Sequence, residues 1–174
     1  MVELKIQNYQ KNIKKYQKIK NKLEKISKNN IPIHHVGSTA IPDMCGKNII
    51  DVLIGASNNL EFLQLKEKII KLGFFASENS KSEIYQFFAS KQGETGDGDI
   101  HIHLAIINTE RYDEFLILKN YLLSHKDEAN SYANHKKTLI RLGITDRKKY
   151  RETKSIYVSS LIERAKINCK YKRG

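Results

Sequence analysis

A glycine–serine pair and a single aspartate are the residues of this chain whose types and spacing most clearly predict chemistry. Gly37 and Ser38 follow the apolar run 31–36, in the segment His35-Val36-Gly37-Ser38. A glycine lets a ligand come close to the backbone, and the N–H groups of a turn bind phosphate oxygens. The serine hydroxyl adds one more donor. We therefore predict an anion-binding loop at this segment, with Gly37 and Ser38 as its phosphate-binding residues.

Asp51 lies within the almost continuously apolar stretch Asn-Ile-Ile-Asp-Val-Leu-Ile-Gly of residues 48–55. Such a run is typical of a buried central strand. A carboxylate in this setting is costly unless it is paired or binds a metal ion. We predict Asp51 as a catalytic and metal-binding residue. The alternative is a buried aspartate whose hydrogen bonds cap a loop.

His101 and His103 alternate with apolar residues in the run 100–107. In a strand, alternate side chains project from the same face, so the two imidazoles point the same way. If Asp51 shares that face, two histidines and a carboxylate suit Zn²⁺, Mn²⁺ or Fe²⁺. The alternatives are that they bind phosphate, that they form only local hydrogen bonds, or that one of them, His103 being the candidate, acts as a general acid or base.

The chain is strongly basic, with 31 Lys and Arg against 19 Asp and Glu and a formal net charge of +12. This balance favours anionic partners, although the charges are spread over the first helix and the last third of the chain. Charge alone therefore does not predict a nucleic-acid-binding protein. Lys47 precedes the Asp51 run and is close enough to reach a phosphate at Gly37 and Ser38, or it is a solvated loop lysine.

The spacing of apolar residues predicts the elements that must position these side chains. We expect helices over 2–28 and 59–72, with Leu60, Leu63, Ile69 and Leu72 on one side of the second. Extended runs are expected at 31–36, 48–55, 74–75, 84–89 and 100–107, with a polar glycine-rich loop at 92–99. Three helices follow, over 109–123, 126–142 and 147–167.

This order of elements predicts an α/β fold, or more strictly an α+β mixed sheet, followed by a helical subdomain. We expect a core with its N-terminal helix over residues 1–108. Helices of residues 109–174 are expected to pack on that core, so that the chain forms a single structural unit.

Three stretches resemble the GrpB family (UPF0157), which belongs to the nucleotidyltransferase superfamily. Residues 34–54, His-His-Val-Gly-Ser-Thr-Ala-Ile-Pro-Asp-Met-Cys-Gly-Lys-Asn-Ile-Ile-Asp-Val-Leu-Ile, resemble its signature. Asp-Ile-His-Ile-His-Leu at 99–104 resembles its histidine-containing strand, and Asp-Arg-Lys-Lys-Tyr-Arg-Glu-Thr-Lys at 146–154 its C-terminal helical motif. The resemblance covers about residues 5–165.

The resemblance implies a nucleotidyltransferase-like (polymerase-β-like) core, a twisted mixed sheet with helices behind it. In active members of the superfamily a Gly-Ser turn holds a triphosphate, and carboxylates on two strands hold Mg²⁺. Gly37 and Ser38 match that turn and Asp51 matches the first carboxylate, but Leu53 stands where the second would be. The resemblance also marks Arg147, Tyr150 and Lys154 as residues that close the cleft over an anion.

Two functions follow as expectations. One is the transfer of a nucleotidyl or phosphoryl group to a small acceptor, with a divalent metal as cofactor: Mg²⁺ or Mn²⁺, or Zn²⁺ if the histidines ligate. The other is a catalytically inactive module that binds a nucleotide or an anionic metabolite. A nucleic-acid partner through the lysine-rich first helix is the least favoured interpretation. No apolar run approaches the roughly 20 residues that span a bilayer, so we expect no membrane partner and a cytoplasmic location.

Overall fold

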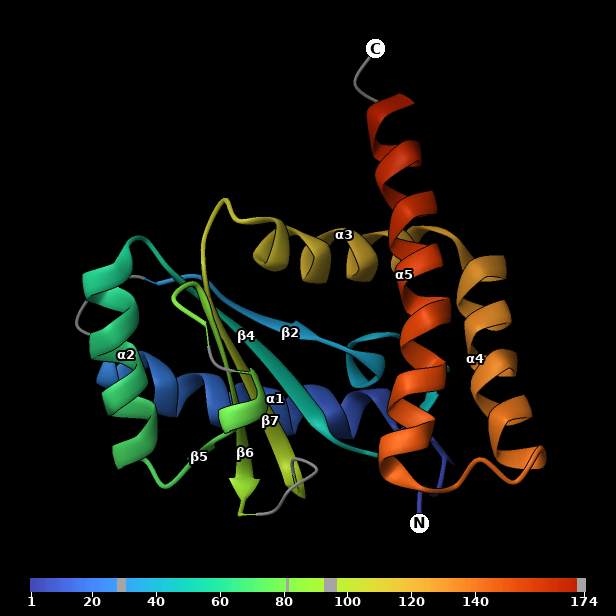
Figure 1. Cartoon of the computed structure of the whole chain (residues 1–174), viewed down its shortest axis with the longest axis horizontal. Helices are drawn as coiled ribbons and strands as arrows, with labels where there is room; N and C mark the ends of the chain where they lie inside the picture. Colours follow the sequence, from blue (N-terminus) through green and yellow to red (C-terminus); the bar gives the residue numbers. More distant parts are fainter. Residues whose placement is uncertain (28–30, 81, 93–96, 172–174) are drawn as a thin grey trace.

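The computed structural model describes residues 1–27, 31–80, 82–92 and 97–171, and a mixed five-stranded sheet organises them (Figure 1). The strand order is β2-β4-β7-β6-β5, in which β4 and β7 are parallel and the other neighbours antiparallel. This confirms the predicted mixed-sheet fold. The strands are β2 (Ile33–Val36), β4 (Ile50–Ala56), β5 (Phe75–Ala76), β6 (Tyr85–Lys91) and β7 (Asp97–Ile106).

Two helices, α1 (Tyr9–Ile26) and α2 (Asn59–Lys71), cover one face of the sheet (Figure 1). The alternate residues Ile50, Val52 and Ile54 of β4 point toward this face and are almost fully buried. The largest apolar cluster of the described residues lies here, because both helices present apolar side chains at three- and four-residue steps. It also contains Leu23, Phe62, Leu65, Ile69, Phe88, Ile102 and Leu104.

The opposite face of the sheet is covered by α3 (Glu110–Ser124), on which α4 (Lys126–Arg141) and α5 (Arg147–Tyr171) pack (Figure 1). Val36, Leu53 and Ala105 form a small core with Tyr112 of α3. Leu53 therefore belongs to the packing between the sheet and α3. This face of β4 also carries Asp51, two residues earlier on the same strand.

The first helix begins later than the spacing of apolar residues predicts. Residues 5–6 form β1 (Lys5–Ile6), which pairs with β3 (Cys45–Gly46), and the helix starts at Tyr9. The Asn8 side chain caps it by accepting a hydrogen bond from the Lys11 N–H at 2.9 Å. The expected start at residue 2 is therefore wrong, and the expected end at residue 28 lies outside the described residues.

The exposed side of α2 also differs from the prediction. Leu60 and Leu63 are 67% and 56% exposed, whereas Ile69, predicted to lie on the same side, packs into the core with Phe62 and Leu65. Both sets fit a helical period, so periodicity alone does not decide between them. The set with the bulky Phe62 faces the sheet because it buries more apolar surface.

Further along, β7 begins at Asp97, earlier than expected, and residues 93–96 of the predicted glycine-rich loop lie outside the described residues. The later helices follow the prediction closely. No helix in the described ranges is long and apolar enough to cross a membrane.

Candidate functional site

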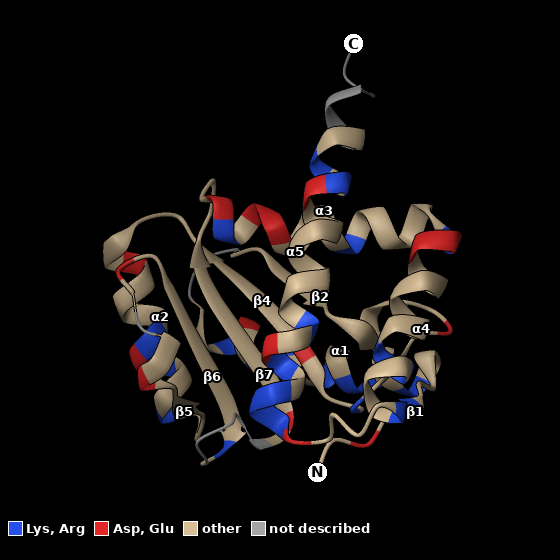
Figure 2. Cartoon of the chain, turned by 45° about the vertical axis from the view of Figure 1, so that its right-hand side comes forward, with Lys and Arg blue, Asp and Glu red and all other residues tan. Residues whose placement is uncertain are grey.

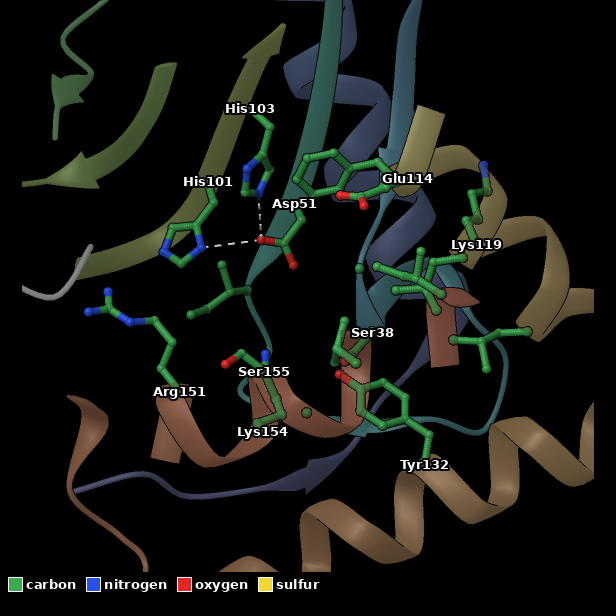
Figure 3. Close-up of a pocket in the computed structure, with 18 of the residues that line it drawn as sticks. Ser38, Asp51, His101, His103, Glu114, Lys119, Tyr132, Arg151, Lys154 and Ser155 are labelled. Atoms are coloured by element: carbon green, nitrogen blue, oxygen red, sulfur yellow. Dashed lines mark hydrogen bonds and ion pairs between the residues drawn. The ribbon is translucent and has the colours of Figure 1, made fainter. Parts of the chain in front are cut away.

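A cavity of about 740 Å³ lies between the Asp51 face of the sheet and the three C-terminal helices (Figure 3). Strands β4 and β7 contribute Asp51, His101 and His103, and the turn after β2 contributes Gly37 and Ser38. The predicted residues Lys47, Tyr150 and Lys154 also line the cavity. Arg147, predicted with them, is not among the lining residues.

The Gly37–Ser38 turn is fixed by a close approach to Asp51. Gly37 has φ 70° and ψ −170°, a conformation that is almost confined to glycine. A Cβ added to Gly37 would lie 2.2 Å from the Asp51 Oδ2, so a side chain at this position and the carboxylate exclude each other. The chain then forms a short 3-10 helix over residues 38–40.

Thr39 ties this turn to the strand that carries Asp51. Its hydroxyl donates to the Ile49 carbonyl at 3.1 Å and lies 3.0 Å from the His35 Nε2. The His35 ring stacks on Tyr16 of α1 with 4.7 Å between ring centroids. Burial lowers the pKa of His35 to about 4, so its imidazole is neutral at pH 7. His35 therefore supports the turn from behind and does not enter the cavity lining.

The parallel pairing of β4 with β7 places Asp51 beside His101, and Leu53 beside His103. Both imidazoles point toward the Asp51 carboxylate (Figure 3). The Asp51 Oδ1 lies 3.2 Å from the His101 Nδ1 and 3.6 Å from the His103 Nε2. Burial raises the pKa of Asp51, but the contacts with the two histidines outweigh it, and the pKa falls well below its usual range.

His103 connects Asp51 to Tyr85 of β6. The Tyr85 hydroxyl lies 2.8 Å from the His103 Nδ1. Burial lowers the pKa of His103 although Asp51 raises it, so the neutral imidazole is favoured. A neutral ring with its proton on Nε2 faces the carboxylate with an N–H and accepts from Tyr85 at Nδ1. Asp51, His103 and Tyr85 thus form a continuous polar chain along the wall of the cavity.

The predicted metal ligands Asp51, His101 and His103 come together around the Asp51 carboxylate, with His101 at hydrogen-bond distance and His103 at 3.6 Å. Within the described part of the chain, no group of three or more His, Cys, Asp or Glu side chains is arranged to hold a metal ion. A two-Mg²⁺ site needs several hard oxygen ligands, and Leu53 is buried in the core where the second carboxylate would be. These strand residues therefore do not fit a two-Mg²⁺ centre. A divalent metal stays a prediction.

Positive charges surround the Gly37–Ser38 end of the cavity. The first turns of α5 are rich in Lys and Arg (Figure 2), and Arg151 and Lys154 from these turns line the cavity. Desolvation lowers the pKa of Lys47 and Lys154, and Asp51 raises both. Arg147 does not line the cavity, but its positive charge also lowers the pKa of Lys47.

Lys136 of α4 is a site residue that the sequence pattern did not predict, as are Tyr132 and Arg151. It is 2% exposed, and its Nζ donates to the Ser38 Oγ at 3.0 Å and to the Cys45 carbonyl. The ammonium lies over the Tyr132 ring, 4.5 Å from its centroid. A signal was present, because Lys136 follows Tyr132 by one helical turn on the buried stripe of α4.

The mixed sheet, the Gly-Ser turn after β2 and the aspartate on the neighbouring strand together form a nucleotidyltransferase-like fold. A crystal structure of the conserved protein GrpB from Enterococcus faecalis superposes with a TM-score of 0.79 at 22% identity, covering 94% of this chain and 96% of that chain. A structure of Cid1, described for its RNA terminal uridylyl transferase activity, superposes with a TM-score of 0.54 at 16% identity. The match covers 82% of this chain and 43% of that one. At these identities the likeness concerns the fold.

The chain belongs to the GrpB family, whose model, described as GrpB protein, matches residues 3–164. A UPF0157 protein of Pseudomonas aeruginosa is 33% identical over 134 residues, which are 76% of this chain and 54% of that protein. The Bacillus subtilis UPF0157 protein YqkA is 27% identical over 144 residues, 83% of this chain and 40% of that protein. This chain thus spans about half the length of the Pseudomonas relative, or less in the case of YqkA.

Replacing Gly37 by alanine tests the close approach of the turn to Asp51. Gly143 has a similar φ, 76° against 70°, but nothing lies within 4 Å of a Cβ added there. Both substitutions place alanine at positive φ, and only Gly37→Ala collides with the carboxylate. We expect Gly37→Ala to lower the free energy of unfolding by about 1–3 kcal/mol more than Gly143→Ala, measured by urea denaturation. Equal losses would show that the contact imposes no constraint.

Lys136 makes stability depend on pH in a defined direction. Burial lowers its pKa from 10.5 to about 7, so between these values the unfolded chain holds a proton at Lys136 that the folded protein lacks. Stability therefore rises with pH in this window. Relative to Lys136→Met, we expect the wild-type free energy of unfolding to increase by about 2 kcal/mol from pH 7 to pH 9.

The control for this titration is Lys126→Met, which removes an exposed lysine at the start of α4 that is not among the charges acting on Lys136, and it should keep the wild-type pH dependence. Urea denaturation at several pH values measures all three proteins. An identical pH dependence in the wild type and Lys136→Met would contradict a lowered Lys136 pKa.

Proposed function

We propose that this protein binds a nucleoside triphosphate in the cavity, with the phosphates at the Gly37–Ser38 turn. The observation that carries this proposal is the excess of cations there. Lys47, Lys136, Arg151 and Lys154 line this cavity, and Asp51 is the carboxylate that raises the pKa of three of these lysines, Lys47, Lys136 and Lys154. An anion would balance these charges and restore the solvation that burial removes.

The other carboxylates of the cavity are already engaged away from this end. Glu110, Glu114 and Glu163 all lie within 3.4 Å of the Lys166 Nζ, which joins α3 to α5. They consequently do not neutralise the cations around Ser38. The cavity volume of about 740 Å³ is in the range of small-molecule and cofactor sites, so a nucleotide fits its size.

The turn supplies the geometry that phosphate needs. Gly37 presents its backbone without a side chain, and turns of this kind bind phosphate oxygens through their backbone N–H groups. Ser38 is half-buried and adds a hydroxyl beside them. The family's fold, shared with the nucleotidyltransferase Cid1, supports a triphosphate as the ligand.

Binding is tested by thermal shift and calorimetry with ATP, CTP, GTP and UTP. We expect at least one of them to stabilise the wild type. Lys154→Met should weaken that binding about 10- to 100-fold, because it removes a charge-assisted hydrogen bond to phosphate worth about 1.5–3 kcal/mol.

The matched control is Lys148→Met, which removes an exposed lysine from the same end of α5 that does not line the cavity. It should bind like the wild type. The proposal fails if no triphosphate binds, or if the two variants lose affinity equally, since the effect would then come from net charge alone.

Nucleotidyl transfer is the second candidate, and the Asp51–His103–Tyr85 chain on the cavity wall favours it. In that reaction a hydroxyl oxygen of a small acceptor attacks the α-phosphorus. The new P–O bond forms as the bond to pyrophosphate breaks, and the hydroxyl proton passes to the Tyr85 oxygen as the Tyr85 proton moves to the His103 Nδ1 beside Asp51. Binding without transfer is the expected behaviour if the buried Leu53 has removed the standard chemistry.

Release of pyrophosphate separates transfer from binding. If the protein is a transferase, pyrophosphate appears when a bound triphosphate is incubated with candidate hydroxyl acceptors and Mg²⁺ or Mn²⁺, and Asp51→Asn lowers the rate at least 100-fold. A wild type that binds a triphosphate tightly and releases no pyrophosphate would leave the binding module as the function. An undiminished rate in Asp51→Asn would remove Asp51 from the mechanism.

A further inference from the structure

Lys136 is an almost fully buried lysine that lies directly behind the phosphate-binding turn. Its Nζ contacts two oxygens, the Ser38 Oγ at 3.0 Å and the Cys45 carbonyl, and one aromatic face, that of Tyr132. Among the ion pairs of the described residues, none involves Lys136. A buried ammonium without a carboxylate is costly, whereas a neutral amine still has two N–H groups for these two oxygens.

The charges that face Lys136 do not stabilise the ammonium enough to offset its burial. Lys154 of α5 and Lys137 of α4 repel it, while Asp51 of β4 and the Cys45 thiol of β3 favour the charged form. Desolvation is the largest influence, and the pKa of Lys136 falls to about 7. Without a ligand, the amine is therefore mostly neutral above pH 8.

We propose that Lys136 and Ser38 together bind the terminal phosphate of the ligand, and that Lys136 takes up a proton from solvent as this phosphate binds. The inference rests on the proposed function, since it needs an anion at the Gly37–Ser38 turn. No covalent bond changes: one proton moves from the buffer to the Lys136 amine, and the phosphate supplies the counter-charge that the protein lacks there.

The same arrangement specifies the charge of the group that is bound. Protonated Lys136 adds a positive charge beside that of Lys154. Two negative charges on the bound group neutralise these two positive charges better than one does. A terminal phosphate has a second pKa near 6 and carries about two negative charges at pH 8. A phosphodiester or a carboxylate carries one. The site should accordingly prefer a terminal phosphate, as found at the end of a nucleoside triphosphate.

Inorganic tripolyphosphate tests this inference without any contribution from a base. Calorimetric titrations at pH 8, in buffers that differ in ionisation enthalpy, give the number of protons taken up per bound anion. With a free-state pKa near 7, about nine-tenths of Lys136 is neutral at pH 8, so we expect about 0.9 proton to be taken up.

Lys136→Met should bind tripolyphosphate at least 10-fold more weakly and with no proton uptake. Lys126→Met, which loses an exposed lysine at the start of α4 outside the cavity lining, should keep both the affinity and the uptake of the wild type. Lys136 can also be followed in the unaltered protein by the pH titration of its ¹³Cε resonance, whose midpoint should move from about 7 to a higher pH when tripolyphosphate saturates the site.

The outcomes separate this inference from the proposed function. Binding of tripolyphosphate by the wild type with no proton uptake, or with an unchanged uptake in Lys136→Met, overturns the role of Lys136 and leaves the phosphate site standing. A resonance midpoint that does not move on saturation overturns it as well. If neither tripolyphosphate nor any nucleoside triphosphate binds the wild type, the proposed function fails and this inference fails with it.

Discussion

The close approach of the Asp51 carboxylate to the Gly37 backbone is the contact on which the rest of the site depends. It requires a residue without a side chain at the end of β2, and it sets the distance between the turn and β4. The parallel register of β4 and β7 then brings His101 and His103 to the same carboxylate. Ser38, one residue beyond Gly37, is thereby placed over Lys136, so sheet register and turn geometry together determine where the polar groups meet.

Electrostatic balance is the reason why we propose an anionic ligand for this site. The carboxylate of Asp51 is stabilised by two imidazoles. The charged forms of the cavity lysines Lys47 and Lys154 are disfavoured by desolvation and by neighbouring positive charges. Lys136 shows the cost most clearly, because burial without a carboxylate makes its charged form unfavourable in the free protein. We therefore propose that a phosphate binds here by supplying the missing charge.

Much of the site could be predicted from residue types, and the remainder depended on tertiary packing. Asp51 stood out because a carboxylate interrupts an apolar strand, and alternation put His101 and His103 on one face. Lys136 did not stand out, since its place one helical turn after Tyr132 marks a buried position only once α4 is known to pack behind the turn. The same limit applies to α2, where two apolar stripes fit one helical period, and to β1, whose two residues form a strand only through β3.

A crystal structure of the protein with a bound nucleoside triphosphate is the sharpest test of a phosphate site at the Gly37–Ser38 turn. We expect phosphate oxygens at this turn, within hydrogen-bond distance, about 2.6–3.2 Å, of both the Ser38 Oγ and the Lys136 Nζ. Triphosphate density elsewhere on the protein, or in the cavity but remote from this turn, would contradict it.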